Sequence, residues 1–272
     1  MSEGETMSKL SLSRAWEETM AVLAHEGRLV LPVALALFVL PGLILNASMP
    51  AAEMGQFPPG GAWVAIALVA LLISLVGQLA VIRLAMEPHV SVGEAIAHGL
   101  RRLLPYIAAM LLWLMPILVV GSALYEFLDA NQAKPSLAAS LALILLCILF
   151  AFVAVKLMLA SAVASAEDSG PIAILRRSWE LSAGNWWRLF AFLLFFALGA
   201  LCLLWAVESV FGVLARVMFG DIAPLTIGGL LVAIVTQLVS AIVSVIFFVI
   251  IARIYVQRAG GEAQPSVPSS GI

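Results

Sequence analysis

The residues of this chain that could bind a metal ion are three histidines and one glutamate. His25, His89 and His98, with Glu87, offer the imidazole and carboxylate groups that bind transition metals. Their spacing matches no ligand pattern, so solvated loop residues are the favoured interpretation. The sequence also contains no G-x-S-x-G, H-E-x-x-H or Gly-Lys motif. We therefore expect no enzyme, no cofactor and no metal, although an enzyme with an unfamiliar site stays an alternative.

Three cations that close long apolar segments have the chemistry to bind phosphate. These are Arg83, Lys156 and Arg253. A charge at the centre of a bilayer costs at least ~2.5–3.5 kcal/mol, so these positions need an explanation. One interpretation is snorkelling, in which the long stem reaches the headgroup layer. The other is that the three cations converge on one lipid phosphate.

A second set of residues combines arginine with tryptophan. Arg176 and Arg177 lie close to Trp179 in an amphipathic segment, in which the arginines would face anionic lipid headgroups while the tryptophan enters the acyl boundary. The alternative is that the arginines pair with Glu167 or Asp168 in a packed cytoplasmic collar. Interfacial anchors are also expected at Trp16, Trp186, Trp187 and Arg188.

Uncharged polar residues recur at helical spacing inside two apolar segments. They are Ser74, Gln78, Thr236, Ser240 and Ser244. Stripes of small and hydroxylic residues usually mark close helix packing. A polar substrate path lined by Gln78 and Gln237 is the alternative interpretation.

The composition places these residues in a membrane. The chain has 272 residues, of which 63% are hydrophobic and 11% charged, and its mean hydropathy is +1.11. A soluble domain has roughly a quarter of its residues charged. A net charge of −2 provides no basic surplus for nucleic acid, so none is expected as a partner. Cys147 and Cys202 lie in apolar runs and predict neither a disulfide framework nor a zinc site.

Six apolar segments are long enough to cross a bilayer, which takes about twenty helical residues. They predict an all-α, polytopic membrane protein with spans near Leu29–Ala47, Ala62–Ile82, Leu103–Leu124, Leu137–Val155, Leu189–Val207 and Ile227–Ala252. Twelve of the fourteen basic residues lie on one side of these spans, and only Lys134 and Arg216 on the other. Basic loops stay in the cytoplasm, so both termini are expected there. A cleaved signal peptide at the first span is disfavoured, because the segment before it is long and acidic.

Three amphipathic stretches indicate a threefold internal repeat. They begin near Ser11, Ser91 and Ser169, and each precedes a pair of spans. The predicted pseudo-repeats cover residues 10–90, 91–168 and 169–258, each with an interfacial helix, in one six-span domain of residues 1–258. Residues 259–272 are expected to form a disordered tail.

The first and third stretches share residues as well as pattern. Arg14-Ala15-Trp16-Glu17 matches Arg177-Ser178-Trp179-Glu180, and Arg28-Leu29 matches Arg188-Leu189. The second stretch keeps Arg102-Leu103 but has no tryptophan. It opens with a capping box, in which Ser91 and Glu94 satisfy free backbone amides. The alternative to a duplication is that any cytoplasmic flank of a span carries arginine and tryptophan as interfacial anchors.

One segment resembles a known family. Residues 167–190 read EDSGPIAILRRSWELSAGNWWRLF, and this resembles the membrane domain of bacterial glycerophosphodiester phosphodiesterases and its stand-alone relatives. The resemblance implies an integral protein of the bacterial inner membrane with a lipid-related role. The catalytic phosphodiesterase barrel has no counterpart in this sequence.

These observations predict a lipid-interacting scaffold or envelope-homeostasis protein, with anionic membrane lipids as partners. The alternative is a small transporter or permease-like component. A transporter is expected to show discontinuous helices and ionisable groups at mid-membrane. In this sequence the charges gather at the cytoplasmic edge, which disfavours a transporter of charged solutes only.

Overall fold

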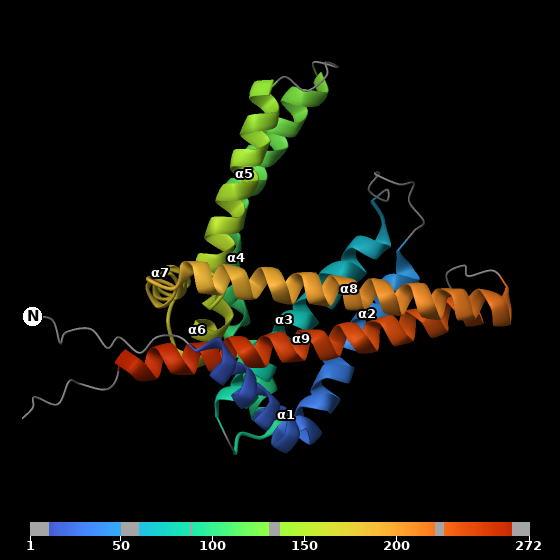
Figure 1. The fold of residues 1–272 in the computed structure, drawn as a ribbon, viewed down its shortest axis with the longest axis horizontal. Coiled ribbons are helices and arrows are strands. Elements are labelled where there is room, and N and C mark those ends of the chain that lie inside the picture. Colours follow the sequence, from blue (N-terminus) through green and yellow to red (C-terminus); the bar gives the residue numbers. More distant parts are fainter. Residues whose placement is uncertain (1–10, 50–59, 88, 131–136, 221–225, 263–272) are drawn as a thin grey trace, which may run out of the picture.

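The fold is helical throughout the part of the chain that the computed structural model describes, which is residues 11–49, 60–87, 89–130, 137–220 and 226–262 (Figure 1). The predicted all-α class is therefore confirmed. Six helical segments are long and apolar enough to cross a membrane, and they overlap the six predicted spans. They are Leu31–Ser48, Ala62–Met86, Val92–Leu124, Ser140–Ala166, Trp186–Phe219 and Ile227–Gly260.

The helices form three hairpins in chain order. Their bounds are α1 Leu12–Ala34, the π-helical turn η1 Leu35–Val39, α2 Leu40–Ser48, α3 Ala62–Met86, α4 Val92–Ala130, α5 Leu137–Lys156, α6 Ala160–Ala166, α7 Pro171–Leu181, α8 Trp186–Phe219 and α9 Ile227–Glu262. Helix α9 extends past the expected domain boundary, so residues 259–262 of the expected disordered tail are helical. Residues 263–272 lie outside the described residues.

The amphipathic stretches begin as the sequence predicts. The Ser11 hydroxyl accepts from the Arg14 amide at 3.3 Å. The predicted capping box is confirmed, with the Ser91 amide donating to Glu94 at 2.9 Å and the Glu94 amide donating to the Ser91 hydroxyl at 3.2 Å. Pro171 occupies the first turn of α7, where its missing amide hydrogen costs nothing.

Of the three amphipathic stretches, only the third forms a separate helix, α7. Helices α1 and α4 run through their amphipathic stretches into the following spans. After α7 the chain turns, and Gly184 adopts φ +76°. Glycine takes this left-handed conformation without the steric cost of a Cβ, so a glycine at this position permits the turn.

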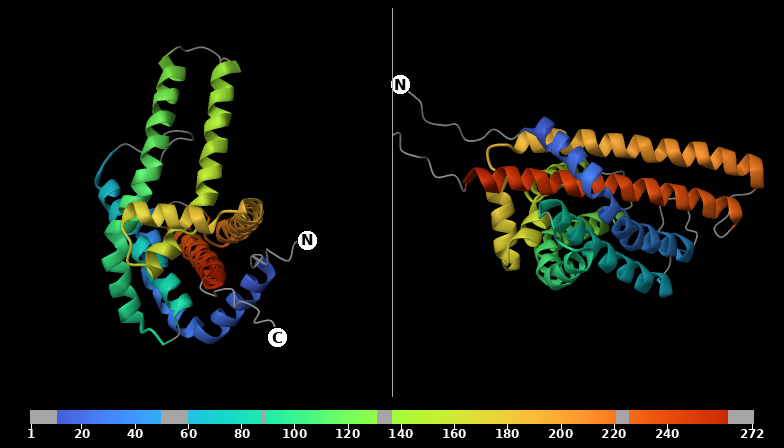
Figure 2. Two further views of the ribbon diagram at one scale, coloured as in Figure 1. Left: turned by 90° about the vertical axis from the view of Figure 1, so that its left-hand side faces the viewer. Right: turned by 90° about the horizontal axis from the view of Figure 1, so that it is seen from below.

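The buried core lies at the end of the molecule where α1 begins and α9 ends (Figures 1 and 2). We call this region the hub and define it by α6, α7, the buried residues Leu79–Ala85 of α3 and the buried residues Val249–Tyr255 of α9. The hairpins α2–α3, α4–α5 and α8–α9 leave the hub, and α4–α5 points away from α8–α9 in both figures. Apolar side chains along α5 and α8 are largely exposed, as a lipid-facing surface requires.

Small residues bring the amphipathic helices close to the spans. Two small residues four positions apart are buried in each case: Ala15 and Thr19 of α1, Ala95 and Gly99 of α4, and Ser178 of α7 with its C-cap residue Ser182. Helix α4 packs on α3, α7 on α6, and α1 on α9. Each amphipathic helix thus packs against the helix that closes the preceding hairpin, with the first packing on the last. The threefold repeat itself stays a prediction.

The contact at Gly99 gives a test of this packing. A Cβ added at Gly99 would lie 2.9 Å from the Val76 carbonyl oxygen, whereas nothing lies within 4 Å of one added at Gly93 in the same helix. We expect Gly99→Ala to force α3 and α4 apart and to cost about 1–3 kcal/mol, as overpacking does. Thermal unfolding of the purified protein should show a lowered midpoint for Gly99→Ala only. Equal midpoints for the Gly99 and Gly93 variants would contradict the close approach.

Candidate functional site

The centre of the hub is the carbonyl end of α6, which Arg102 of α4 binds. The Arg102 guanidinium donates to the carbonyl oxygens of Ala164 at 2.9 Å and Ser169 at 2.8 Å, and also to that of Glu167. Its side chain is only 11% exposed, and it lies 3.6 Å from the exposed Asp168 carboxylate. A helix end leaves four carbonyls without intrahelical partners, and this arginine satisfies part of that need.

Two further side chains converge on Ser165 in the same helix. Its carbonyl oxygen accepts from Arg83 at 3.4 Å and lies 3.0 Å from the His98 Nε2 atom. The Ser165 hydroxyl in turn donates to the Leu79 carbonyl at 2.8 Å. Helices α3 and α4 are thereby fastened to α6 by hydrogen bonds.

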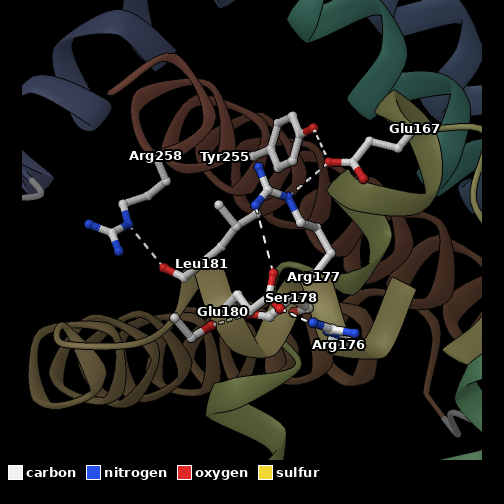
Figure 3. Close-up of polar contacts among 9 residues, drawn as sticks. Glu167, Arg176, Arg177, Ser178, Glu180, Leu181, Tyr255 and Arg258 are labelled. Atoms are coloured by element: carbon white, nitrogen blue, oxygen red, sulfur yellow. Dashed lines mark hydrogen bonds and ion pairs between the residues drawn. The ribbon is translucent and has the colours of Figure 1, made fainter. Parts of the chain in front are cut away.

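Glu167 joins α7 and α9 to this cluster (Figure 3). Its carboxylate accepts from the Tyr255 hydroxyl at 2.9 Å and pairs with Arg177 at 3.3 Å. Nearby, Arg258 donates to the Leu181 carbonyl at 2.9 Å, so the end of α9 is also tied to the end of α7.

The two arginines expected to face lipid have different surroundings. Arg177 is 29% exposed and pairs with Glu167 and Glu180, so the pairing with Glu167 named in the alternative is present for this residue. Arg176 is 81% exposed and pairs with Glu180 across one helical turn. Contact with a lipid headgroup stays a prediction for Arg176.

The fourth span is interrupted where α5 ends at Lys156 and α6 begins at Ala160. The Lys156 carbonyl accepts from the hydroxyls of Ser178 in α7 at 3.1 Å and of Ser182, the C-cap residue of α7, at 2.9 Å. In this way α7 supplies hydrogen bonds that the broken helix cannot make with itself.

The three cations expected at one phosphate have different surroundings. Arg83 pairs with Glu87 at 2.7 Å, and the Lys156 ammonium lies 5.2 Å from the centre of the Trp179 ring. The Nε atom of Arg253 is buried and has no hydrogen-bond partner among the described residues. A shared phosphate site for these residues stays a prediction.

Most of the expected interfacial tryptophans gather beside Lys156. Trp186 stacks on Phe190 with ring centres 5.1 Å apart, and Phe152 lies between Trp179 and Trp186. Trp187 is 74% exposed, and Arg188 next to it is exposed too. Trp16 of α1 is 48% exposed. Apart from Trp16, these rings form an aromatic group at the hub end of α5, α7 and α8. Tryptophan is enriched at membrane–water interfaces, so this group fits such a position.

The histidines are not part of a metal cluster in the described region. No group of three His, Cys, Asp or Glu side chains comes together among the described residues. His98 contacts Ser165, as above, and His89 is an exposed residue in the turn before α4. The side chain of His25 lies outside the described part of the structure.

A second site is a cavity of about 420 Å³ between α2, α3 and α9. It lies next to the hub, where these helices leave it. Gln78 and Gln237, the pair named for a polar path, both line it. Of the polar residues in the two stripes, Ser74, Gln78, Ser240 and Ser244 line this space and Thr236 does not. The complete lining is Phe38, Gly42, Leu45, Ala67, Ala70, Leu71, Ser74, Leu75, Gln78, Gln237, Ser240, Ala241, Ser244 and Phe248.

Sequence reasoning missed the central role of Arg102 and the contact of Tyr255 with Glu167. The only local signals were an arginine at a buried helix face and the acidic pair before α7. The serines Ser178 and Ser182 carried a clearer signal, since two hydroxyls four residues apart in a short helix can reach one acceptor. Their acceptor, the Lys156 carbonyl, appears only when the break in the fourth span is known.

The six long apolar helices and the aromatic group at the hub end of α5, α7 and α8 are those of a multi-pass α-helical membrane protein. A family model described as a domain of unknown function, DUF7847, matches residues 10–258, and the chain belongs to that family. No curated protein and no solved structure matches the chain.

Arg102 gives a test of the hub. Arg102→Gln removes the charge-assisted hydrogen bonds to the carbonyl end of α6, each worth about 1.5–3 kcal/mol. We expect a lower unfolding midpoint and faster proteolysis between α6 and α7. Arg101→Gln, at the exposed neighbouring position, should change neither quantity. Equal behaviour of the two variants would show that Arg102 does not hold the hub together.

Proposed function

We propose that this protein is a non-catalytic membrane protein that binds anionic lipid through the hub and serves as a scaffold or envelope-homeostasis component. The observation that carries the proposal is a group of cations and aromatic rings around α7: exposed Arg176, Trp179 and Trp187, with half-buried Lys156 beside the Trp179 ring. Cations beside amphipathic aromatic rings suit the boundary between anionic headgroups and acyl chains.

The hub faces the cytoplasm in this proposal. Twelve of the fourteen basic residues belong to segments at the hub end by the predicted topology, and this is the distribution expected of cytoplasmic loops. The resemblance of residues 167–190 to the phosphodiesterase membrane domain supports the bacterial inner membrane as the location and a lipid-related role.

The second candidate function is a small transporter or permease-like component. One observation favours it: the first span departs from α-helical geometry at η1, beside the polar cavity. Non-helical backbone at membrane depth is tolerated where it is buried in protein or lines a cavity, and it is common in transporters.

Lipid binding can be measured in vesicles of equal parts phosphatidylglycerol and phosphatidylcholine. The double variant Lys156→Gln and Arg176→Gln should retain less phosphatidylglycerol after mild extraction, because each cation near anionic lipid contributes ~1 kcal/mol, or about five-fold in affinity. The matched control is Lys134→Gln with Arg216→Gln, the two basic residues of the opposite side. If the hub variant retained as much phosphatidylglycerol as the unmodified protein, the proposed role of these cations would be wrong.

Orientation can be measured with single cysteines in a background of Cys147→Ser and Cys202→Ser. Met49 and Ala183 are exposed at opposite ends of the molecule. In intact cells, Met49→Cys should react with an impermeant thiol reagent, whereas Ala183→Cys should react only after permeabilisation. The reverse pattern would place the hub outside the cytoplasm.

A further inference from the structure

We infer that the cavity between α2, α3 and α9 binds an uncharged ligand that carries hydroxyl or amide groups next to an apolar part. This inference deepens the second candidate function, since a transporter would need such a site. It does not depend on lipid binding at the hub. The three helices that enclose the cavity belong to the first and third hairpins and lie side by side (Figure 1).

The polar side chains of the cavity fall into two groups. On α3, the Ser74 hydroxyl donates to the Leu37 carbonyl at 3.4 Å, and the Gln78 amide donates to the Tyr106 hydroxyl at 3.3 Å. On α9, the side chains of Gln237, Ser240 and Ser244 make no hydrogen bond to any other described residue. One wall of the cavity therefore has free donors and acceptors.

Free polar groups at this depth need a partner. The cavity lies within segments that are apolar enough to cross a membrane, where hydrocarbon offers no hydrogen bonds. An amide or hydroxyl left without a partner in an apolar medium costs roughly 2–7 kcal/mol. Water or a ligand in the cavity removes that cost, and a ligand that matches the amide of Gln237 and the two hydroxyls does so with defined geometry.

The backbone opposite Gln237 is shaped to admit its side chain. A Cβ at Gly42 would overlap the amide oxygen of Gln237 and lie 2.8 Å from its Cδ atom. Glycine at position 42 thus leaves the room in which the amide lies. The preceding residue, Pro41, has no amide hydrogen for the Leu37 carbonyl, which instead accepts from Ser74. The local sequence of η1 and α2 is consistent with a wall built around a polar space.

The lining also defines the charge of the ligand. No Asp, Glu, Lys, Arg or His is among the described residues that line the cavity. An ion entering it would lose its hydration without a counter-charge, which is far more costly than burial of a neutral polar group. The apolar lining, which includes Phe38, Leu45, Leu71 and Phe248, suits the hydrocarbon part of the ligand. The volume of about 420 Å³ is within the range of small-molecule sites.

The hub closes one end of the cavity. Phe38 and Phe248 lie at the hub end of the cavity with ring centres 5.7 Å apart. Beyond them come the buried residues of the hub, such as Leu79 and Val249. A ligand therefore arrives from the bilayer or from the aqueous phase at the opposite end, and these two sources share the same chemistry at the site.

The test uses three probes on the purified full-length protein in mild detergent, with native mass spectrometry to count bound molecules during titration. The first probe is 1,2-dioctanoylglycerol, which is uncharged and has a hydroxyl, two esters and apolar chains. The second is dioctanoyl phosphatidic acid, which adds a charged phosphate. The third is glycerol, which has hydroxyls alone. We expect a saturable one-to-one complex with dioctanoylglycerol and at least ten-fold weaker binding of the phosphatidic acid.

Variants identify the cavity as the binding site. Gln237→Leu keeps the side-chain volume but removes the free amide, and should weaken dioctanoylglycerol binding about ten-fold. Gly42→Ala displaces the same amide by steric overlap and should act in the same direction. The control is Gln257→Leu, the same substitution on α9 at a residue that does not line the cavity, and it should bind like the unmodified protein. Ser240→Ala serves as a further cavity variant if either of the first two fails to fold.

Each outcome decides the inference. Binding of dioctanoylglycerol without glycerol identifies a ligand from the bilayer, and binding of both identifies a ligand that water can also supply. The proposed site is overturned if neither dioctanoylglycerol nor glycerol binds, or if the phosphatidic acid binds as tightly as dioctanoylglycerol. Unchanged affinity in the folded cavity variants would overturn it too. Movement of a bound probe across proteoliposomes is a separate measurement, and its absence would remove the transporter function while leaving the binding site.

Discussion

The buried carbonyl end of α6 is the constraint on which the hub depends. Helix α6 is short and consists of alanine, serine and valine, so it contributes little apolar surface of its own. Its place is set by polar contacts from other helices, with Arg102 and His98 reaching it from α4 and Arg83 from α3. Because Glu167 follows α6 directly and binds Tyr255 and Arg177, the same helix end also positions α7 and α9.

Serine hydroxyls complete the backbone at two places where it departs from an unbroken α-helix. Ser74 donates to the Leu37 carbonyl in η1, and Ser178 and Ser182 donate to the Lys156 carbonyl at the break before α6. In each case the donor belongs to a different helix from the acceptor. Within a membrane no water is available for this purpose, so each irregularity is tied to the arrival of a neighbouring helix.

The sequence predicts the features that depend on local chemistry. Apolar length identifies the six segments, and Ser11, Ser91 and Pro171 begin their helices as expected because capping involves only residues within one turn. The contacts of the hub are different, since Arg102 meets carbonyls that are distant in the chain. The two alternatives for Arg177 show this limit, because the local sequence is the same whether it faces lipid or Glu167.

The cavity could not be predicted from the sequence for the same reason. The spacing of Gln78 and of Ser240 and Ser244 placed each on one face of a helix, but the sequence did not say which helices would meet.

The arrangement of three hairpins that spread from one hub has a mechanical consequence. Hairpin α4–α5 leaves the hub in a different direction from α8–α9 (Figure 1), so the polar contacts of α6 set the angle between them. A small rotation at the hub therefore becomes a large displacement at the far ends of the hairpins, about 20 residues of helix away.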